Sequence, residues 1–396
     1  MISVFDNKED CCGCTACKSI CQTQAISMEP DKEGFLYPEI NQELCIDCSK
    51  CRKVCAFQNG YDIPGNLRQP KVYAAKHNNE NIRSNSTSGG AFTAISDYVL
   101  DNNGVVFGAA FDENMNVIQQ VASTAKERDK FRGSKYVQSD LKNVYKEISM
   151  LLKDDVQVLF TGTPCQTAGL YRFLEGHNIE NLILCDLVCH GTPSPLMWRE
   201  HIRHLEKKEK SKVDEYYCRH KVEGWHTHTE MVIYKNGKED YKSIISQEHK
   251  TLFYSHNILR PSCHNCKYTN LMRPSDITIA DFWGIEKYMP DFDDNKGISL
   301  ILVNSAKCEQ LLKEVSNNLT LKESNTEDCL QPQLKEPSQP SPDRAEFWED
   351  YKTYGYDYII RKYAGYNLRT VIKRNIIALK MAIIGEKKKN EHKINN

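Results

Sequence analysis

The sequence predicts a small cysteine-rich α+β module, followed by a mixed α/β domain with a partly parallel sheet and a C-terminal helical tail. Two observations support this prediction. Nine of the seventeen cysteines lie between Cys11 and Cys55, and beyond residue 70 short apolar runs alternate with segments of helical periodicity. The chain has 396 residues, a length that allows about two to three domains. Hydrophobic residues make up 40% of the chain, which is enough to form a hydrophobic core.

The first module, expected over residues 1–57, carries one cysteine pattern twice. The spacing C-x2-C-x2-C-x3-C occurs at 11–21 and again at 45–55, as in bacterial ferredoxins with two 4Fe-4S clusters. Three cysteines of each run bind one cluster and the fourth binds the other. The pattern therefore predicts a ferredoxin-like module with two ligand sets, namely Cys11, Cys14, Cys17 and Cys55, and Cys45, Cys48, Cys51 and Cys21.

Zinc is the alternative metal for these cysteines, but zinc favours two separated CxxC pairs over two runs of four. Cys12 does not fit the spacing, and we expect it to be a spare thiol.

Glycine and proline over residues 58–70 predict a linker. We expect one large domain after it, in two parts at 71–152 and 153–320, and a tail at 321–396. A strand should open the domain at Lys71. In the tail, residues 367–389 form a basic amphipathic pattern. A packing helix is favoured there over contact with a membrane surface.

A polar loop precedes a helical pattern in the first part of the domain. The loop contains Ser86, Thr87, Ser88, Gly89 and Gly90. The free N–H groups of a first helical turn, with glycines that allow close approach, suit a phosphate group. An ordinary N-cap without a ligand is the alternative interpretation.

A second set of cysteines lies at predicted strand ends and in a later CxxC. Apolar strands precede Cys165 and Cys189, and a helix between them indicates a parallel pair whose carboxyl ends share one edge. With Cys263 and Cys266 they make four candidate ligands of a third cluster. Structural zinc and reduced core thiols remain alternatives. Four further cysteines lack partners at ligand spacing and are expected to be structural, namely Cys185, Cys218, Cys308 and Cys329.

Six ordered motifs resemble the coenzyme F420 hydrogenase/dehydrogenase beta-subunit family, in the form with an N-terminal ferredoxin domain. They are STSGGAF at 86–92, RGSKYVQS at 132–139, TGTPCQTAGL at 161–170, CDLVCHGTPSP at 185–195, CHNCKY at 263–268 and SDITIADFWG at 275–284. The resemblance covers nearly the whole chain up to residue 303. One departure is Ala280, where the family pattern leads us to expect glycine.

The resemblance implies a flavin, FAD or FMN with FAD favoured, next to a cubane cluster. It adds Lys135, Tyr136 and Gln138 as candidate flavin or substrate contacts and favours the phosphate interpretation of the loop at 86–90. The expected activity is that of a flavin-dependent iron–sulfur oxidoreductase, with a small-molecule hydride acceptor or donor and a redox partner protein such as ferredoxin. A non-catalytic electron-relay subunit of a larger complex is the alternative.

The net charge and the amino-terminal residues indicate which partners and which cellular location to expect. The net charge is −1, so bulk electrostatics predicts no nucleic-acid partner. No apolar run reaches about 18 residues, so we expect no membrane span. The first ten residues are polar and acidic and do not resemble a signal peptide. We therefore expect a cytoplasmic protein.

Overall fold

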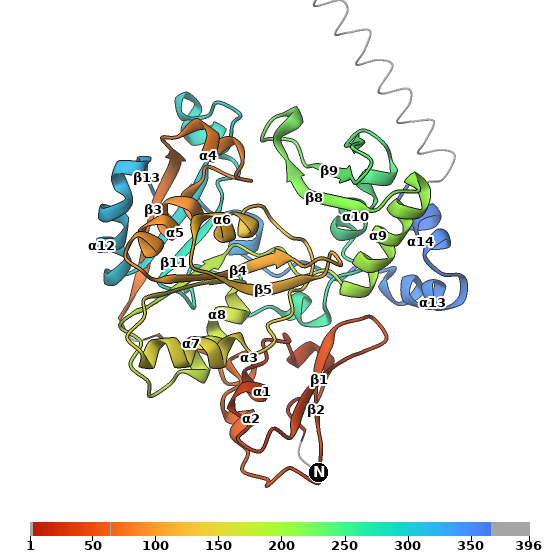
Figure 1. Cartoon of the computed structure of the whole chain (residues 1–396), viewed down its shortest axis with the longest axis horizontal. Helices are drawn as coiled ribbons and strands as arrows, with labels where there is room; N and C mark the ends of the chain where they lie inside the picture. Colours follow the sequence, from red (N-terminus) through yellow and green to blue (C-terminus); the bar gives the residue numbers. More distant parts are fainter. Residues whose placement is uncertain (1–2, 64, 366–396) are drawn as a thin grey trace, which may run out of the picture.

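The computed structural model describes residues 3–63 and 65–365 (Figure 1). A small cysteine-rich module lies at one end, next to a large sheet with helices on its faces. The basic segment predicted over 367–389 lies outside the described residues. Within the described part, no helix is long and apolar enough to cross a membrane.

The N-terminal module is a hairpin flanked by two cysteine loops. Strands β1 (Ile26–Pro30) and β2 (Leu36–Ile40) pair antiparallel. Each cysteine loop has two residues in the left-handed region, and the second of them is Thr15 at φ 63° in one loop and Ser49 at φ 59° in the other. Both precede a short helix, α1 (Ala16–Ile20) and α2 (Lys50–Lys53). The two cysteine repeats therefore fold alike, and α3 (Ala56–Asn59) closes the module.

The large sheet has eight strands in the order β13-β3-β12-β11-β7-β6-β4-β5. Its four central strands run parallel, namely β4 (Val105–Phe111), β6 (Val158–Gly162), β7 (Leu182–Leu187) and β11 (Ile277–Asp281). Strands added antiparallel on the two sides are β3 (Asn66–His77), β5 (Val117–Ala122), β12 (Ser299–Ser305) and β13 (Leu319–Ser324). The predicted mixed, partly parallel sheet is confirmed.

Strand β3 begins at Asn66, five residues earlier than the predicted start at Lys71. Residues 66–70 therefore belong to the sheet, and the connection from the module is shorter than the predicted linker. Pro70 lies where the β3–β12 register is irregular. Proline lacks an N–H for the hydrogen-bond ladder and is tolerated at such irregularities. Pro70 therefore lies within β3, although the glycine and proline content of residues 58–70 predicted a linker there.

Helices cover both faces of the sheet. The longer ones are α5 (Ala91–Asp101), α7 (Val144–Lys153), α8 (Pro164–Phe173) and α12 (Ala306–Val315). Short helices are α4 (Glu80–Ser84), α6 (Ala125–Arg128) and α11 (Ile285–Tyr288). One hydrophobic core joins Ala16 and Phe57 of the module to Tyr145 and Leu170 of α7 and α8. Burial of this shared apolar surface holds the module against the domain.

A second, three-stranded sheet lies beside the first and was not predicted. It contains β8 (Val213–His220), β9 (Thr229–Tyr234) and β10 (Glu239–Asp240), all antiparallel. Helices α9 (Pro195–Glu209), α10 (Glu248–Tyr254), α13 (Arg344–Tyr354) and α14 (Tyr356–Tyr363) pack around it (Figure 1). The last two form the predicted helical tail within the described residues.

Candidate iron–sulfur and redox site

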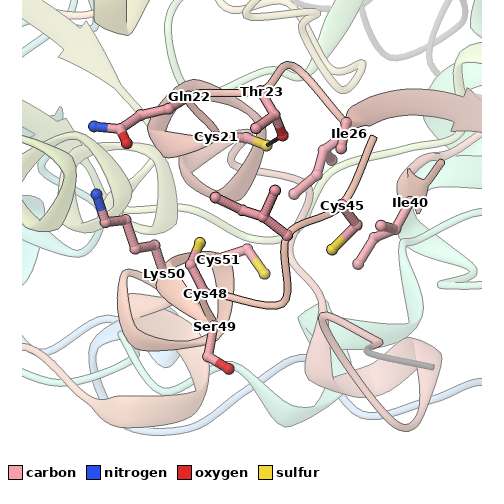
Figure 2. A pocket seen from close by; sticks show the side chains of 12 residues that line it. Cys21, Gln22, Thr23, Ile26, Ile40, Cys45, Cys48, Ser49, Lys50 and Cys51 are labelled. Atoms are coloured by element: carbon pink, nitrogen blue, oxygen red, sulfur yellow. Dashed lines mark hydrogen bonds between the residues drawn. The ribbon is translucent and has the colours of Figure 1, made fainter. Parts of the chain in front are cut away.

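The second cysteine run lines a pocket near the tip of the module. Figure 2 shows Cys45, Cys48 and Cys51 around this pocket, with Cys21 entering from the other run. Ile26 and Ile40 of the hairpin form its apolar wall. These four cysteines are the set that the spacing groups together, and a cubane with four thiolate ligands fits their arrangement.

The first cysteine run lines a second pocket, deeper in the molecule. Its lining includes Cys11, Cys14 and Cys17, joined by Cys55 from the other run. Gln58 donates a hydrogen bond to Cys55 Sγ at 3.4 Å. The crossed arrangement expected of a two-cluster module is thus present in the side-chain positions. The ligand role of each cysteine stays a prediction.

The four cysteines of the predicted third cluster meet at one edge of the large sheet. Cys165 lies in the first turn of α8, directly after β6, and Cys189 follows β7. Cys263 and Cys266 come from the loop at 261–266. Burial raises the pKa of Cys189 well above its usual value, and Cys263, Cys165 and Cys266 raise it further through their proximity. Neighbouring thiols in a desolvated site suit a cluster that binds them as thiolates.

Cys12, predicted to be a spare thiol, lies between two of these cysteine sets. It is buried, and the neighbouring Cys14 and Cys165 side chains, together with burial, raise its pKa well above the usual value. The inner pocket of the module and the third cysteine set are therefore neighbours. Gly169 of α8 makes the approach possible, because a Cβ at this position would stand 2.8 Å from Cys14 Sγ.

A buried arginine bridges the same region. Arg260 donates to the Cys11 carbonyl at 2.8 Å, to Leu36 O at 3.0 Å and to Gln138 Oε1 at 2.8 Å. Its guanidinium also lies 4.1 Å from the centre of the Tyr37 ring. Arg260 stands three residues before Cys263, so one cation lies beside both the module and the third cysteine set. Sequence spacing carried no signal for this residue.

The loop at 86–90 uses many of its polar groups internally. Ser86 Oγ donates to Ile82 O at 2.7 Å, and Ser88 Oγ donates to Ile298 O at 2.8 Å. Gly89 N donates to Ser299 Oγ at 3.0 Å. Gly90, at φ 92°, is the N-cap of α5 and has no side chain to cap it, although Ala91 N donates to Ser299 Oγ at 3.4 Å. The serines therefore shape the loop, while the first turn of α5 keeps its positive end.

Several groups around that turn form what we call the anion cradle, namely His77, Thr87, Gly90, Arg132 and Ser134. Ser134 N donates to Thr87 Oγ1 at 3.2 Å, which joins the loop at 132–139 to the loop at 86–90. The buried His77 Nε2 has no hydrogen-bond partner among the described residues. Burial lowers the pKa of His77; Asp97 raises it, whereas Arg132 and Arg128 lower it. Arg132 and Arg128 both pair with Asp129, and Arg128 also pairs with Asp97, so the unpaired buried nitrogen of His77 is the feature that suits a ligand group here.

The three candidates in the loop at 132–139 point to different places. Lys135 Nζ donates to Lys130 O and Arg132 O at 2.8 Å each, and burial lowers its pKa to about 7. The Tyr136 ring stacks on Phe253 with centroids 4.7 Å apart. Gln138 Nε2 donates to Cys12 O at 3.1 Å. The loop therefore runs from the anion cradle to the cysteine sets.

Aromatic rings gather beside Cys189 in what we call the aromatic patch. Its members are Tyr136, His190, His228, Phe253, Tyr254 and Trp283, linked by ring contacts of 4.7 to 5.5 Å. Arg219 lies 4.6 Å from the centre of the Trp283 ring and pairs with Asp281 at 2.7 Å. The patch draws on five separate segments, so no local pattern could reveal it. Ala280, the departure from the family pattern, pairs regularly with Leu300 in the sheet.

The family models match nearly the same residues as the sequence motifs. The model for the N-terminal part of the coenzyme F420 hydrogenase/dehydrogenase beta subunit matches residues 72–146, and that for its C terminus matches 155–328. A 4Fe-4S dicluster domain matches residues 10–59. No curated protein sequence matches the chain.

One solved structure with similarity is the xenon-derivatised F420-reducing NiFe hydrogenase complex from Methanosarcina barkeri. A chain of it is 17% identical over 75% of this chain and 97% of its own length, with a TM-score of 0.46.

The fold and the cysteine sets define an iron–sulfur electron-transfer protein of the oxidoreductase type. The chain belongs to the coenzyme F420 hydrogenase/dehydrogenase beta-subunit family, with a 4Fe-4S dicluster domain at its N terminus.

Proposed function

We propose that this protein is an iron–sulfur flavoprotein oxidoreductase that passes electrons between 4Fe-4S clusters and a flavin. The final acceptor or donor is an organic molecule, coenzyme F420 or another small molecule. The contact of Cys12 with both Cys14 and Cys165 carries the proposal. It supports a continuous arrangement in which the inner cluster of the module is adjacent to a third cluster in the domain.

Two features support a flavin nucleotide in the domain. The anion cradle offers the first turn of α5 and Arg132 to a phosphate group. The aromatic patch offers flat ring faces next to Cys189. The loop at 132–139 connects the anion cradle with the aromatic patch. Its Ser134 contacts Thr87 of the cradle, and its Tyr136 stacks on Phe253 of the patch. FAD fits this spread better than FMN, because its two halves need separate binding regions.

A flavin held here would supply conversion between hydride transfer, which moves two electrons, and the single-electron transfer that a cubane cluster requires. The protein's own groups bind and position. In this proposal Arg132 holds phosphate charge, the aromatic patch lies beside the ring, and the partly buried cysteines around Cys189 lie next to it. Burial lowers the pKa of His190 to about 4, with His256 adding to the effect. His190 is then neutral at pH 7 and leaves the patch without a cation at this position.

The test is composition after purification without oxygen. We expect about twelve irons and about twelve sulfides per chain, since each of three cubanes holds four of each, with about one flavin. Arg132→Gln should lower the flavin content and leave iron unchanged. Lys126→Gln, a change of a cation on nearby α6, is the matched control and should alter neither. About eight irons without flavin would refute both the third cluster and the flavin.

A turnover assay with several candidate acceptors would identify the class of substrate. The loaded protein, supplied with reduced ferredoxin, should reduce a deazaflavin or another hydride acceptor, and the acceptor that is consumed identifies the class.

The relay alternative gains support from the outer pocket. Leu44 and Ile46 are 49% and 66% exposed beside Cys45 and the exposed Cys48, and apolar side chains at a cluster edge suit docking of a redox protein. A protein that carries flavin and clusters, turns over no small molecule and yet reduces a partner protein would favour the relay function.

A further inference from the structure

Three side chains of metal-ligand type meet in the core between the small sheet and α10. Cys218 lies on β8, Glu230 on β9 and His249 on α10, elements that Figure 1 shows together. Each offers one ligand atom, and the three atoms lie within 4.8 Å of one another. Cys218 is 1% exposed, and Glu230 and His249 are 0% exposed. The group lies outside all three cysteine sets described above.

An irregularity in β8 places the cysteine. The β8–β9 register shifts between Tyr217 and His220, and two consecutive residues there, Cys218 and Arg219, are both buried. In a regular strand neighbouring side chains point to opposite faces. A bulge re-aims a side chain. Here Cys218 takes up a position in the core near Glu230.

Hydrogen bonds from neighbouring groups hold the side chains of Cys218 and Glu230 in place, as is common for residues that bind a metal. Tyr136 N donates to Cys218 Sγ at 3.4 Å, and Lys250 N donates to Glu230 Oε2 at 2.8 Å. His249 Nδ1 lies 3.3 Å from Glu230 Oε1. The buried His249 Nε2 has no hydrogen-bond partner within the part of the chain that the structure describes. Backbone donors that hold a thiol and a carboxylate in place are typical of metal sites.

We propose that Cys218, Glu230 and His249 bind one zinc ion. Thiolate sulfur, imidazole nitrogen and carboxylate oxygen are the three ligand types that zinc uses in proteins. One thiolate and one carboxylate balance the charge of a divalent ion, so the buried site is neutral and avoids the cost of an isolated charge. Zinc binds such a mixed site more tightly than ferrous iron does. A water or the second Glu230 oxygen completes the four-coordinate geometry.

The ion ties the small sheet to the redox region. It joins β8, β9 and α10 at one point, and α10 carries Phe253, against which Tyr136 of the aromatic patch stacks. The Tyr136 amide contacts Cys218 directly. The zinc therefore has a structural role under the aromatic patch. This role does not depend on a flavin or on any iron–sulfur cluster.

Metal analysis of the full chain tests the proposal. Protein produced with added zinc and purified without oxygen should hold about one zinc per chain, separate from its iron. The zinc X-ray absorption spectrum should show one sulfur at about 2.3 Å and nitrogen or oxygen at about 2.0–2.2 Å. Less than about one tenth of an equivalent, or a spectrum with four sulfurs from zinc in a cysteine-only site, would overturn the proposal.

Matched variants locate the ion. Cys218→Ala and Glu230→Gln should each lower zinc at least tenfold while iron content stays the same. Cys308→Ala removes another buried thiol, on α12, and should keep the zinc. Equal zinc in Cys218→Ala and Cys308→Ala would overturn the assignment. If a ligand variant fails to fold, chelation of the wild-type protein decides the question. Removal of zinc should lower the melting temperature, and zinc, but not magnesium, should restore it.

Discussion

The guanidinium of Arg260 lies against Cys11, with Nη2 3.6 Å from Cys11 Sγ and Nε donating to the Cys11 carbonyl at 2.8 Å. Arg260 is buried, so its charge is weakly screened and acts strongly on anything that Cys11 binds. A fixed cation favours the more negative, reduced form of a neighbouring cluster. We therefore expect Arg260 to raise the potential of a cluster bound at Cys11, in addition to connecting the module to the domain.

Replacement of Arg260 should lower the potential of the inner cluster. For Arg260→Gln we expect a decrease on the order of 50–100 mV, since about 59 mV corresponds to about 1.4 kcal/mol for one electron. Arg260→Lys should recover part of it. A redox titration followed by electron paramagnetic resonance gives the values. Arg52→Gln, which removes an exposed cation of the module, is the control. A shift of equal size in both variants would contradict the prediction.

Cys12 and Cys14 should behave differently although they are two residues apart. Cys14→Ser removes a predicted ligand and should lower the iron content by up to about four per chain. Cys12→Ser should leave the iron content unchanged, because Cys12 lies between Cys14 and Cys165 outside the ligand pattern. Iron and sulfide assays on both variants decide this. Loss of iron in Cys12→Ser would make Cys12 a ligand.

Gly169→Ala should destabilise the protein, against the usual trend. Alanine in the interior of a helix is ordinarily favoured over glycine by about 1 kcal/mol. Here the new Cβ would lie 2.8 Å from Cys14 Sγ and 3.0 Å from Tyr145 Oη, so the module must move away from α8. We expect a lower melting temperature and loss of iron from the inner cluster. A higher melting temperature with full iron content would contradict this prediction, because it would show that the module can shift away from α8 without loss of stability.

Asp294 should stabilise the fold at neutral pH through Arg83. Arg83 Nη1 donates to Asp294 Oδ2 at 2.8 Å. Burial alone would raise the pKa of Asp294, but hydrogen bonds and attraction from Arg83 outweigh it and hold the pKa well below its usual range. A carboxyl with a depressed pKa contributes stability above its unfolded-state pKa and loses it as the pH falls.

Asp294→Asn should therefore lower the melting temperature at pH 7, by the same amount at pH 5, and by less only below about pH 4. Thermal unfolding followed by tryptophan fluorescence over this range gives the comparison. Asp291→Asn, in the same loop, is the control. A difference that already narrows between pH 7 and pH 5 would mean that another group is responsible.

Local patterns were sufficient for the middle of the fold. The β6–α8–β7 unit was visible in the sequence because two apolar runs flank a segment of helical periodicity, and the parallel pairing is confirmed. The small sheet was not visible. Its strands mix polar and apolar residues, and β8 is irregular at Cys218, so a period of two does not appear in its sequence.

The sequence by itself determined the chemistry of the cysteine-rich module, because cubane ligation imposes a strict spacing on neighbouring residues in the chain. It also indicated where Cys165 and Cys189 would meet, since parallel strands end at one edge. Only the tertiary structure decided the rest. Cys12, Arg260 and Gln138 come together from three distant segments, and so do Cys218, Glu230 and His249. Contacts between distant segments depend on packing, and packing leaves no fixed spacing in the sequence.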